Sequence, residues 1–464
     1  MSDTTSETTT DPIESDEGYA LDNRTVSAVR LAVAAGDSQR LGTLLDPLHA
    51  ADIADLLEQV DSGHRREILL LCPAHFDGDV LSELDEGLRE EVIGFLPPDI
   101  LAEAVRDLES DDVVDLLEDL EEPQQAAILD VLDVPDRVAV EKALSYPEFS
   151  AGRLMQREVV MAPEHWTVGQ AIDHVRANKK TLPDQFYHLI VVDPRLRPVG
   201  YVTLGKLLAS KRSVKLTALF EDSFRTIPVS QPESEVAYAF NQYHLISAPV
   251  VDDDGRLVGA ITIDDAMTVL DEEHEEDILR LAGVGESSLS DRVIETTRQR
   301  FPWLFVNLVT AILASVVIAL FEDAIAQIVA LAVLMPIIAS MGGNAGTQSL
   351  TVAVRALATK DLTGSNVWRV VRRELAVGLI NGAAFALVMG AVSLVWFGSP
   401  DLGVVIAIAM IVNLAIAALA GILIPVTLDR LGVDPALASG TFVTTVTDVV
   451  GFFVFLGLAA TILL

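Results

Sequence analysis

Five long apolar stretches dominate the C-terminal third of the chain. They cover residues 302–321, 324–350, 375–397, 402–427 and 437–464. A helix needs about 20 apolar residues to cross the hydrocarbon core of a bilayer. Each stretch meets that length, and only the last contains an ionisable side chain, Asp448. The pattern therefore predicts an α-helical membrane domain of five transmembrane helices over residues 301–464, with the lipid bilayer as its solvent.

Before the apolar stretches, the chain shows two different patterns of apolar residues. The first pattern has the period of a helix. Over residues 24–150, Leu, Ile and Val recur at i, i+3 and i+4 in segments such as ADIADLLEQV and DDVVDLLEDL. No strand alternation interrupts them, so we expect an all-α superhelical domain. Residues 1–23 are polar and acidic with no apolar core, which predicts a disordered tail and no signal peptide.

Residues 151–271 contain a repeat with strand character. The runs HLIVVD from His188 and APVVDD from Ala248 each follow an amphipathic segment, and each leads through a turn to a second apolar run. The two copies lie about 60 residues apart. This α/β repeat resembles a tandem pair of CBS motifs, a ligand-sensing module. The acidic segment DEEHEEDILRLAGVG follows, and we expect a linking helix within residues 272–300.

The charge is concentrated in the first 300 residues. They hold 60 of the 68 acidic and 26 of the 32 basic residues of a chain whose net charge is −36. A surface this acidic excludes nucleic acid as a partner and attracts cations. Two explanations stand side by side: adaptation to a salty cytoplasm, and specific cation sites. The single cysteine, Cys72, excludes a disulfide framework and a thiolate metal cluster.

The basic residues near the apolar stretches predict the orientation in the membrane. They precede the first stretch, fill the loop between the second and third, and lie between the fourth and fifth. The other two loops contain no Lys or Arg. Because Lys and Arg collect on the cytoplasmic side, we expect residues 1–300 in the cytoplasm, a multi-pass protein of the cell membrane and the C-terminus outside.

Three motifs give the chain a family resemblance. They are YPEFSAGRLM from Tyr146, PIIASMGGNAGTQS from Pro336 and LGVDPALASGTFVTTVTDVVG from Leu431. Together with the domain order, they resemble the MgtE family of Mg²⁺ channels over nearly the whole chain. The resemblance implies a homodimer whose pore is lined by the second and fifth spans of both subunits. It also implies that Mg²⁺ bound to the cytoplasmic domains closes the pore.

Asp448 is the first candidate for the ion path. An ionised carboxylate inside a span is costly and usually faces a wet interior. The alternative is a buried ion pair, but none of the five stretches contains Lys or Arg. Two copies in a homodimer match the charge of one Mg²⁺, and Thr444, one turn earlier, adds an oxygen. Further pore-lining candidates are Thr445 and, in the glycine-rich segment of the second span, Gly343, Asn344, Gly346 and Gln348.

Three glycines and an asparagine in that segment indicate either an irregular backbone that lines water or close packing of helices. The side chains available as ligands limit which ions the membrane domain can bind, because residues 301–464 contain no His or Cys. Asp, Asn, Thr and carbonyl oxygens suit Mg²⁺, Ca²⁺ or Mn²⁺. The residues alone do not separate these three ions.

The candidates for regulation are acids outside the spans. The resemblance implies Mg²⁺ binding at Asp265, Glu273, Glu276, Asp277 and Asp434, with Asp111 and Asp112 as further candidates. At one position where the family can carry such an acid, this chain has Asn241–Gln242–Tyr243–His244 instead. Acids held close together repel one another, so closure by bridging cations is a physical consequence of such clusters.

Nucleotide binding is left open by the repeat. Gly259, Thr262 and Asp265 match the ribose-contacting pattern of CBS pairs that bind ATP, whereas the first copy has Lys206 in place of the acid. His188 and Leu245 occupy the places where an aromatic side chain stacks on adenine in such pairs.

Two other functions stay open: a secondary transporter that exchanges Mg²⁺ for Na⁺ or H⁺, and a membrane sensor without permeation. An enzyme is not expected, because no nucleophile–base pair, P-loop or metal-ligand spacing is present.

Overall fold

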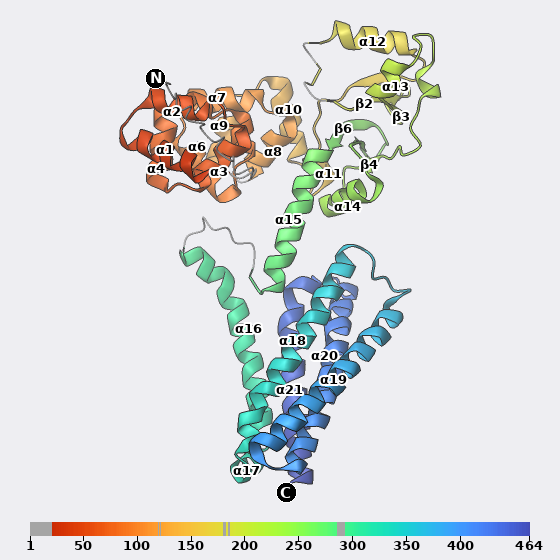
Figure 1. The fold of residues 1–464 in the computed structure, drawn as a ribbon. Helices are drawn as coiled ribbons and strands as arrows, with labels where there is room; N and C mark the ends of the chain where they lie inside the picture. Colours follow the sequence, from red (N-terminus) through yellow and green to blue (C-terminus); the bar gives the residue numbers. More distant parts are fainter. Residues whose placement is uncertain (1–20, 119, 121, 180–181, 184–185, 285–292) are drawn as a thin grey trace, which may run out of the picture. The chain divides into compact units, whose positions relative to one another are not determined.

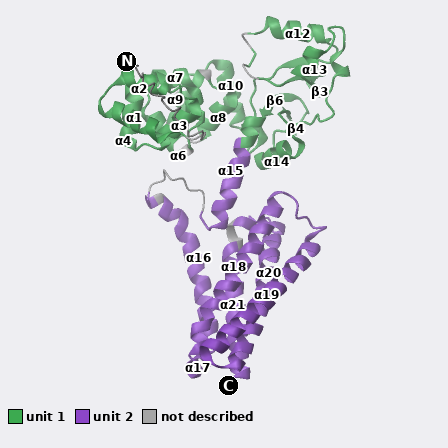
Figure 2. Cartoon of the chain, viewed as in Figure 1, with its two compact units in different colours: residues 1–267 green, residues 268–464 purple. Residues whose placement is uncertain are grey.

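The computed structural model describes residues 21–464 apart from 119, 121, 180–181, 184–185 and 285–292 (Figure 1). The tail predicted for residues 1–23 lies almost entirely outside the described residues. The chain divides into two compact units, residues 1–267 and 268–464 (Figure 2).

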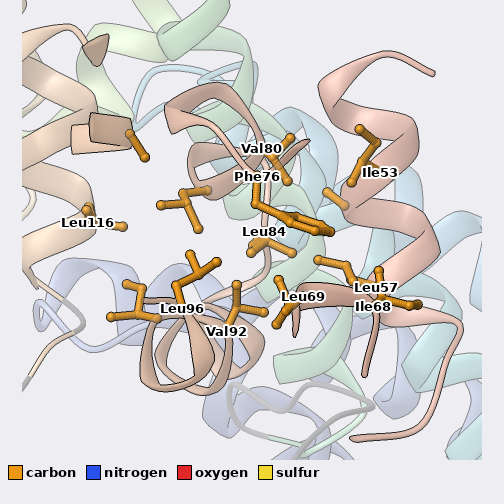
Figure 3. Close-up of a cluster of buried hydrophobic side chains, with 14 of the residues drawn as sticks. Ile53, Leu57, Ile68, Leu69, Phe76, Val80, Leu84, Val92, Leu96 and Leu116 are labelled. Atoms are coloured by element: carbon orange, nitrogen blue, oxygen red, sulfur yellow. The ribbon is translucent and has the colours of Figure 1, made fainter. Parts of the chain in front are cut away.

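The first part of unit 1 is a stack of short helices, as the apolar period predicts. Its helices are α1 (Asn23–Ala34), α2 (Ser38–Leu45), α3 (Ala50–Glu58), α4 (Ser62–Leu71), the 3₁₀ turn η1 (Pro73–His75), α5 (Gly78–Ser82), α6 (Glu86–Phe95), α7 (Pro98–Asp107), α8 (Ser110–Glu118), α9 (Glu122–Leu129) and α10 (Val134–Ala143). Aspartates cap many of the starts; Asp61, for instance, accepts two backbone N–H groups of α4. One core that includes Phe76, Leu84 and Leu116 runs through the stack (Figure 3).

The second part of unit 1 is the predicted repeat. Each copy is a three-stranded sheet, in the order β1-β2-β3 and β4-β5-β6. The elements are α11 (Ala151–Leu154), β1 (Met161–Pro163), α12 (Val168–Ala177), β2 (His188–Val192), β3 (Pro198–Thr203), α13 (Leu204–Ala209), η2 (Leu216–Ala218), β4 (Ile227–Pro228), α14 (Glu233–Tyr243), β5 (Ser247–Val251) and β6 (Leu257–Thr262). The register is the same in both copies, with His188 opposite Thr203 and Ser247 opposite Thr262. The strands β1 and β4 were not predicted, because runs of two or three residues show no period.

The linking helix is α15 (Ile263–Leu281). It begins directly after β6, earlier than the acidic segment alone indicates. Asp265 accepts hydrogen bonds from the backbone N–H and the hydroxyl of Thr262 at this start. Because α15 begins at this cap, the acidic segment lies within the helix and not at its start.

The described residues of unit 2 include five helices that are long and apolar enough to cross a membrane, which confirms the predicted fold class. They are α16 (Val293–Ala319), α18 (Ala330–Ala358), α19 (Val367–Phe397), α20 (Pro400–Arg430) and α21 (Pro435–Ile462), and the short helix α17 (Glu322–Gln327) lies between the first two. The second span begins at Ala330 rather than at residue 324, because the chain leaves the helical conformation at Ile328 (φ −128°, ψ 82°). Helix α20 packs against α18, α19 and α21.

Several of these helices extend beyond the apolar stretches. A helix of 31 residues, such as α19 or α20, is about 46 Å long, whereas the hydrocarbon core is about 30 Å thick. The extra turns carry the charged residues Arg355, Arg369, Arg372, Arg373, Glu374, Asp429 and Arg430. The basic side chains thus lie at the ends of the helices and outside the apolar stretches.

Candidate functional site

One face of α21 carries a polar stripe. Thr441, Thr444, Thr445 and Asp448 are spaced at i, i+3, i+4 and i+7, so they share one side of the helix. Each is exposed or half-buried in the single chain, whereas Val443 and Thr447 are fully buried. The structure therefore gathers the predicted residues Thr444, Thr445 and Asp448 on one face.

Among the described residues, no basic side chain pairs with Asp448. In the part of the chain that the structure describes, no ion pair and no hydrogen bond engages its carboxylate, so the buried-pair alternative is not met. The neighbouring hydroxyls donate to their own helix: Thr444 Oγ1 lies 2.9 Å from Gly440 O, and Thr445 Oγ1 lies 2.6 Å from Thr441 O. Because these protons point into the helix, the hydroxyl lone pairs remain free to accept from a hydrated cation.

The glycine-rich segment does not break the second span. Helix α18 runs without interruption from Ala330 to Ala358, so the close-packing alternative applies and the irregular backbone does not. A Cβ on Gly342 would lie 2.3 Å from Nδ2 of Asn413, and one on Gly346 would lie 2.5 Å from Val443. Gly346 thus packs α18 against α21 and does not open to solvent, unlike the partly exposed Gly343.

Asn413, in the middle of α20, lies at the contact between α18 and α21. Its side chain is fully buried, and its Nδ2 donates to the carbonyl oxygen of Ile338 at 2.9 Å. A Cβ on Gly451 of α21 would lie 3.0 Å from the same amide. One buried amide therefore lies between α18 and α21, and the two glycines make the space for it.

The other face of the segment is polar and open. Asn344 and Gln348 are exposed and line a hollow of about 490 Å³ together with Thr347, Thr351 and Asn381. In a bilayer such groups face protein or water. Asn381, on α19, was missed by the sequence reasoning, although it is a single asparagine within an apolar stretch. Asp448 does not line this hollow, so one chain presents two separate polar faces.

Acids from the two parts of unit 1 meet beside α8. Burial, together with the negative charges of Glu158 and Asp265, raises the pKa of Glu109 to about 7. Burial likewise raises the pKa of Asp112 to about 7 and that of Asp265 to about 6. Burial also holds the pKa of Asp111 well above its usual range, and Asp265 adds to the shift. The predicted residues Asp111, Asp112 and Asp265 therefore form one repulsive cluster, to which the structure adds Glu109.

A second group of acids lies in unit 2 at the end of α15. Asp434 caps α21, because its Oδ1 accepts the N–H of Ala436 at 2.7 Å. Its Oδ2 lies 3.1 Å from Arg280, which also pairs with Glu276 at 2.7 Å. Burial raises the pKa of Glu273 and of Asp277, with their acidic neighbours as the next cause. The predicted acids are brought together, and Arg280, which sequence reasoning missed, lies between two of them.

Neither cluster is a finished metal site. Across the described residues, no three His, Cys, Asp or Glu side chains are placed to hold a metal ion as they stand. The acids of both clusters are close enough to shift one another's pKa but do not converge. A bridging cation would need side-chain rearrangement, which suits reversible binding.

The nucleotide candidates make contacts within the chain. A Cβ on Gly259 would lie 2.5 Å from the carbonyl oxygen of Gln156, and Thr262 donates to Asp265 at 2.6 Å. His188 is buried, which lowers its pKa, and its Nδ1 lies 2.5 Å from Ser247 Oγ. Leu245 belongs to the core of the second copy. Nucleotide binding stays a prediction, with these side chains engaged internally.

The five-span helical domain has polar faces of Asp, Thr, Asn and Gln side chains, and it follows an acidic helical domain and an α/β repeat. This arrangement defines a multidomain membrane transporter whose polar side chains suit a hard cation. Family models agree: residues 335–458 match the divalent cation transporter domain, residues 48–149 the MgtE intracellular N domain, and residues 151–212 and 219–272 CBS domains. The chain belongs to the MgtE family of magnesium transporters, and its function is Mg²⁺ transport.

Individual relatives cover almost the full length. The chain is 32% identical to magnesium transporter MgtE of Thermus thermophilus, over 96% of this chain and 99% of the relative. It is 30% identical to magnesium transporter MgtE of Bacillus subtilis, over 90% and 92%. Among solved structures, the cytosolic domain of the Mg²⁺ channel MgtE in complex with ATP is similar at 30% identity, with a TM-score of 0.49, over 53% of this chain and 99% of that chain.

Proposed function

We propose that this chain is a Mg²⁺-selective channel that mediates magnesium uptake as a homodimer in the cell membrane. Intracellular Mg²⁺ bound to the acidic cytoplasmic domains closes it. The distribution of Lys and Arg supports cytoplasmic N-terminal domains and an external C-terminus. The observation that carries the proposal is Asp448, an unpartnered carboxylate on the threonine-lined face of α21.

The chemistry of that face fits a hydrated Mg²⁺. The ion prefers six oxygens in octahedral geometry and gives up water reluctantly. Two Asp448 carboxylates from two subunits supply a charge of −2 and accept hydrogen bonds from the water shell. Thr444 and Thr445 offer hydroxyl oxygens one turn away. Because the ion stays hydrated, binding is weak enough for release, which conduction requires.

The pore-lining role extends to α18. Asn344 and Gln348 supply amide oxygens at an open polar face, whereas Gly346 acts through packing that holds α18 against α21. Gly343 leaves room beside Asn344, because nothing lies within 4 Å of the place a Cβ would take. The absence of His and Cys from residues 301–464 supports a hard cation over Zn²⁺ or Cu⁺.

Closure is proposed to use the two acidic clusters. Without Mg²⁺, Glu109, Asp111, Asp112 and Asp265 repel one another at the junction inside unit 1. Glu273, Asp277 and Asp434 do the same in unit 2. Mg²⁺ relieves that repulsion and favours the compact arrangement. A shift from 1:99 to 99:1 needs about 5.5 kcal/mol of differential binding, which several weak sites supply jointly.

The test is Mg²⁺ flux into liposomes that contain the purified full chain, with Mg²⁺ varied on the side of the N-terminal domains. Asp448→Asn keeps the size of the side chain and removes its charge, and we expect the flux to be lost, because the charge that attracts the cation into the pathway is gone. Thr461→Val is the matched control, because Thr461 is on the same helix and its hydroxyl also bonds to its own helix.

Three outcomes separate the alternatives. Flux that falls as Mg²⁺ rises and persists without a Na⁺ or proton gradient supports the channel. Flux that requires such a gradient supports the secondary transporter. Folded, dimeric protein without flux at any Mg²⁺ concentration supports the sensor.

A further inference from the structure

Three arginines lie close together at one end of a span in unit 2. Arg369, Arg372 and Arg373 are exposed, and none forms an ion pair within the described part of the chain. Some exposed arginines of unit 1 do pair with acids, as in Arg137–Asp130 and Arg212–Asp173. The three guanidinium groups of unit 2 are therefore available to an anion from outside the chain.

These arginines lie on the first turns of α19, next to Trp368. Trp368 and Arg372 are four residues apart, as are Arg369 and Arg373, so the side chains occupy adjacent positions on the helix. Arg372 Nε donates to the carbonyl oxygen of Trp368 at 3.2 Å. The indole is 68% exposed. Below, these four residues are called the α19 patch.

The α19 patch is held on a fixed base. Val367 and Val371, on the other side of the same turns, are buried in a cluster with Leu362, Ile422 and Val426. Because that side is packed, the helix backbone is held with the patch facing outward. The backbone therefore loses no further freedom when the arginines bind an anion.

The surroundings identify the occupant. Beyond Glu374, the same helix exposes Val377, Leu379 and Ile380, which is the apolar surface of a span. The α19 patch therefore lies where a span meets the headgroup layer, and tryptophan is enriched at that level. Guanidinium groups bind phosphate through paired N–H donors. An anionic phospholipid offers the phosphate, the net charge and the acyl chain together.

We propose that Trp368, Arg369, Arg372 and Arg373 form a binding site for the headgroup of an anionic phospholipid. This goes beyond the bias of Lys and Arg that orients a membrane protein, because it requires the patch itself and not merely charge at that end of the spans. Each guanidinium removed is expected to weaken the preference for anionic lipid about fivefold, since one basic residue near an anionic surface contributes about a factor of that size.

The experiment measures quenching of tryptophan fluorescence in the full chain by brominated phosphatidylglycerol and by brominated phosphatidylcholine. The contribution of Trp368 is obtained by difference from Trp368→Phe. We expect phosphatidylglycerol to quench Trp368 at a lower lipid fraction than phosphatidylcholine does. The triple variant Arg369→Gln, Arg372→Gln, Arg373→Gln is expected to lose that preference tenfold or more.

The matched control removes three arginines from the same end of the spans but outside the patch: Arg298→Gln, Arg300→Gln, Arg430→Gln. It is expected to keep the preference within about twofold. Equal losses in both triple variants would show a diffuse charge effect and overturn the proposal. If the triple variant does not purify as folded protein, single replacements at Arg369 and Arg373 test the proposal instead. Each is expected to lower the preference for anionic lipid about fivefold.

An acidic protein surface is the competing counter-ion. If the patch variant leaves the lipid preference unchanged but alters Mg²⁺ closure equally in pure phosphatidylcholine, the arginines bind an acidic segment of the chain and the lipid proposal is wrong.

Discussion

Arg280 and Asp434 are joined by an ion pair with 3.1 Å between Nη1 and Oδ2, although 154 positions separate them in the chain. The same guanidinium pairs with Glu276 at 2.7 Å. It lies within a group of acids to which the proposed function assigns Mg²⁺ binding. Arg280 is therefore an internal cation that a divalent ion has to displace.

Replacement of Arg280 tests this competition. In Arg280→Gln, Asp434 and Glu276 lose one shared counter-charge, so Mg²⁺ should bind more readily. We expect the Mg²⁺ concentration for half-closure of flux to fall about two- to fivefold, the size of effect typical of a partly exposed ion pair. Arg430→Gln, at an exposed arginine close to α21, is the control. A shift to higher Mg²⁺ would mean that Arg280 itself holds the closed contact.

The glycines of α18 offer a sharp comparison. Gly342→Ala would place a methyl group 2.3 Å from Asn413 Nδ2, whereas nothing lies within 4 Å of the equivalent position on Gly343. We expect Gly342→Ala to lower stability by about 1–3 kcal/mol through overpacking. Gly343→Ala should be neutral or slightly stabilising, because alanine favours helix. Thermal unfolding in detergent measures both, and equal effects would contradict the packing at Asn413.

The junction beside α8 predicts opposite effects for two neighbouring acids. Asp112 is surrounded by acids, and their charge and its burial raise its pKa. Asp115 pairs at 2.7 Å with Arg89, which is buried. Without Mg²⁺, Asp112→Asn should stabilise unit 1 by about 1–2 kcal/mol, and Asp115→Asn should destabilise it by a similar amount. Hydrogen exchange of the backbone amides of α8, measured in EDTA, reports both changes in stability. Destabilisation by both changes would show that Asp112 is not under repulsion.

The same cluster predicts a pH dependence with a definite sign. Glu109 and Asp112 have a pKa of about 7 in the fold and Asp265 of about 6, whereas unfolded carboxyl groups titrate near about 4. The folded state therefore binds these protons more tightly. The contribution of these three groups to the stability of the fold is greatest at low pH and is lost as the pH rises from about 4 through 7.

Hydrogen exchange of α8 without Mg²⁺ should accordingly slow several-fold between pH 8 and pH 6, after correction for the intrinsic rate. Protection by added Mg²⁺ should be smaller at pH 6, because protons and Mg²⁺ relieve the same repulsion. In Asp112→Asn the pH effect should be reduced. Protection that is independent of pH would contradict the raised pKa values.

Sequence reasoning reached the elements with long or repeated patterns. The five spans follow from apolar length, and the two copies of the repeat follow from strand runs that recur at a fixed distance. It left an irregular backbone and close packing open for the glycine-rich segment of the second span. The helix is continuous there, since glycine lowers helix propensity only by about 1 kcal/mol and tertiary packing overrides that. It missed β1, β4 and α17, which are too short to show a period.

The amino-acid sequence by itself determined the fold class and the preference for a hard divalent cation, because apolar length, charge distribution and ligand chemistry are properties of the residues. Its motifs also carried the resemblance to the family. Only the tertiary structure decided which polar groups share a site. Asp265 meets Glu109 and Asp111, Arg280 meets Asp434, and Asn413 lies between Gly342 and Gly451. Each of these pairings joins positions far apart in the chain. The packing of apolar faces sets them, and no local pattern records which faces meet.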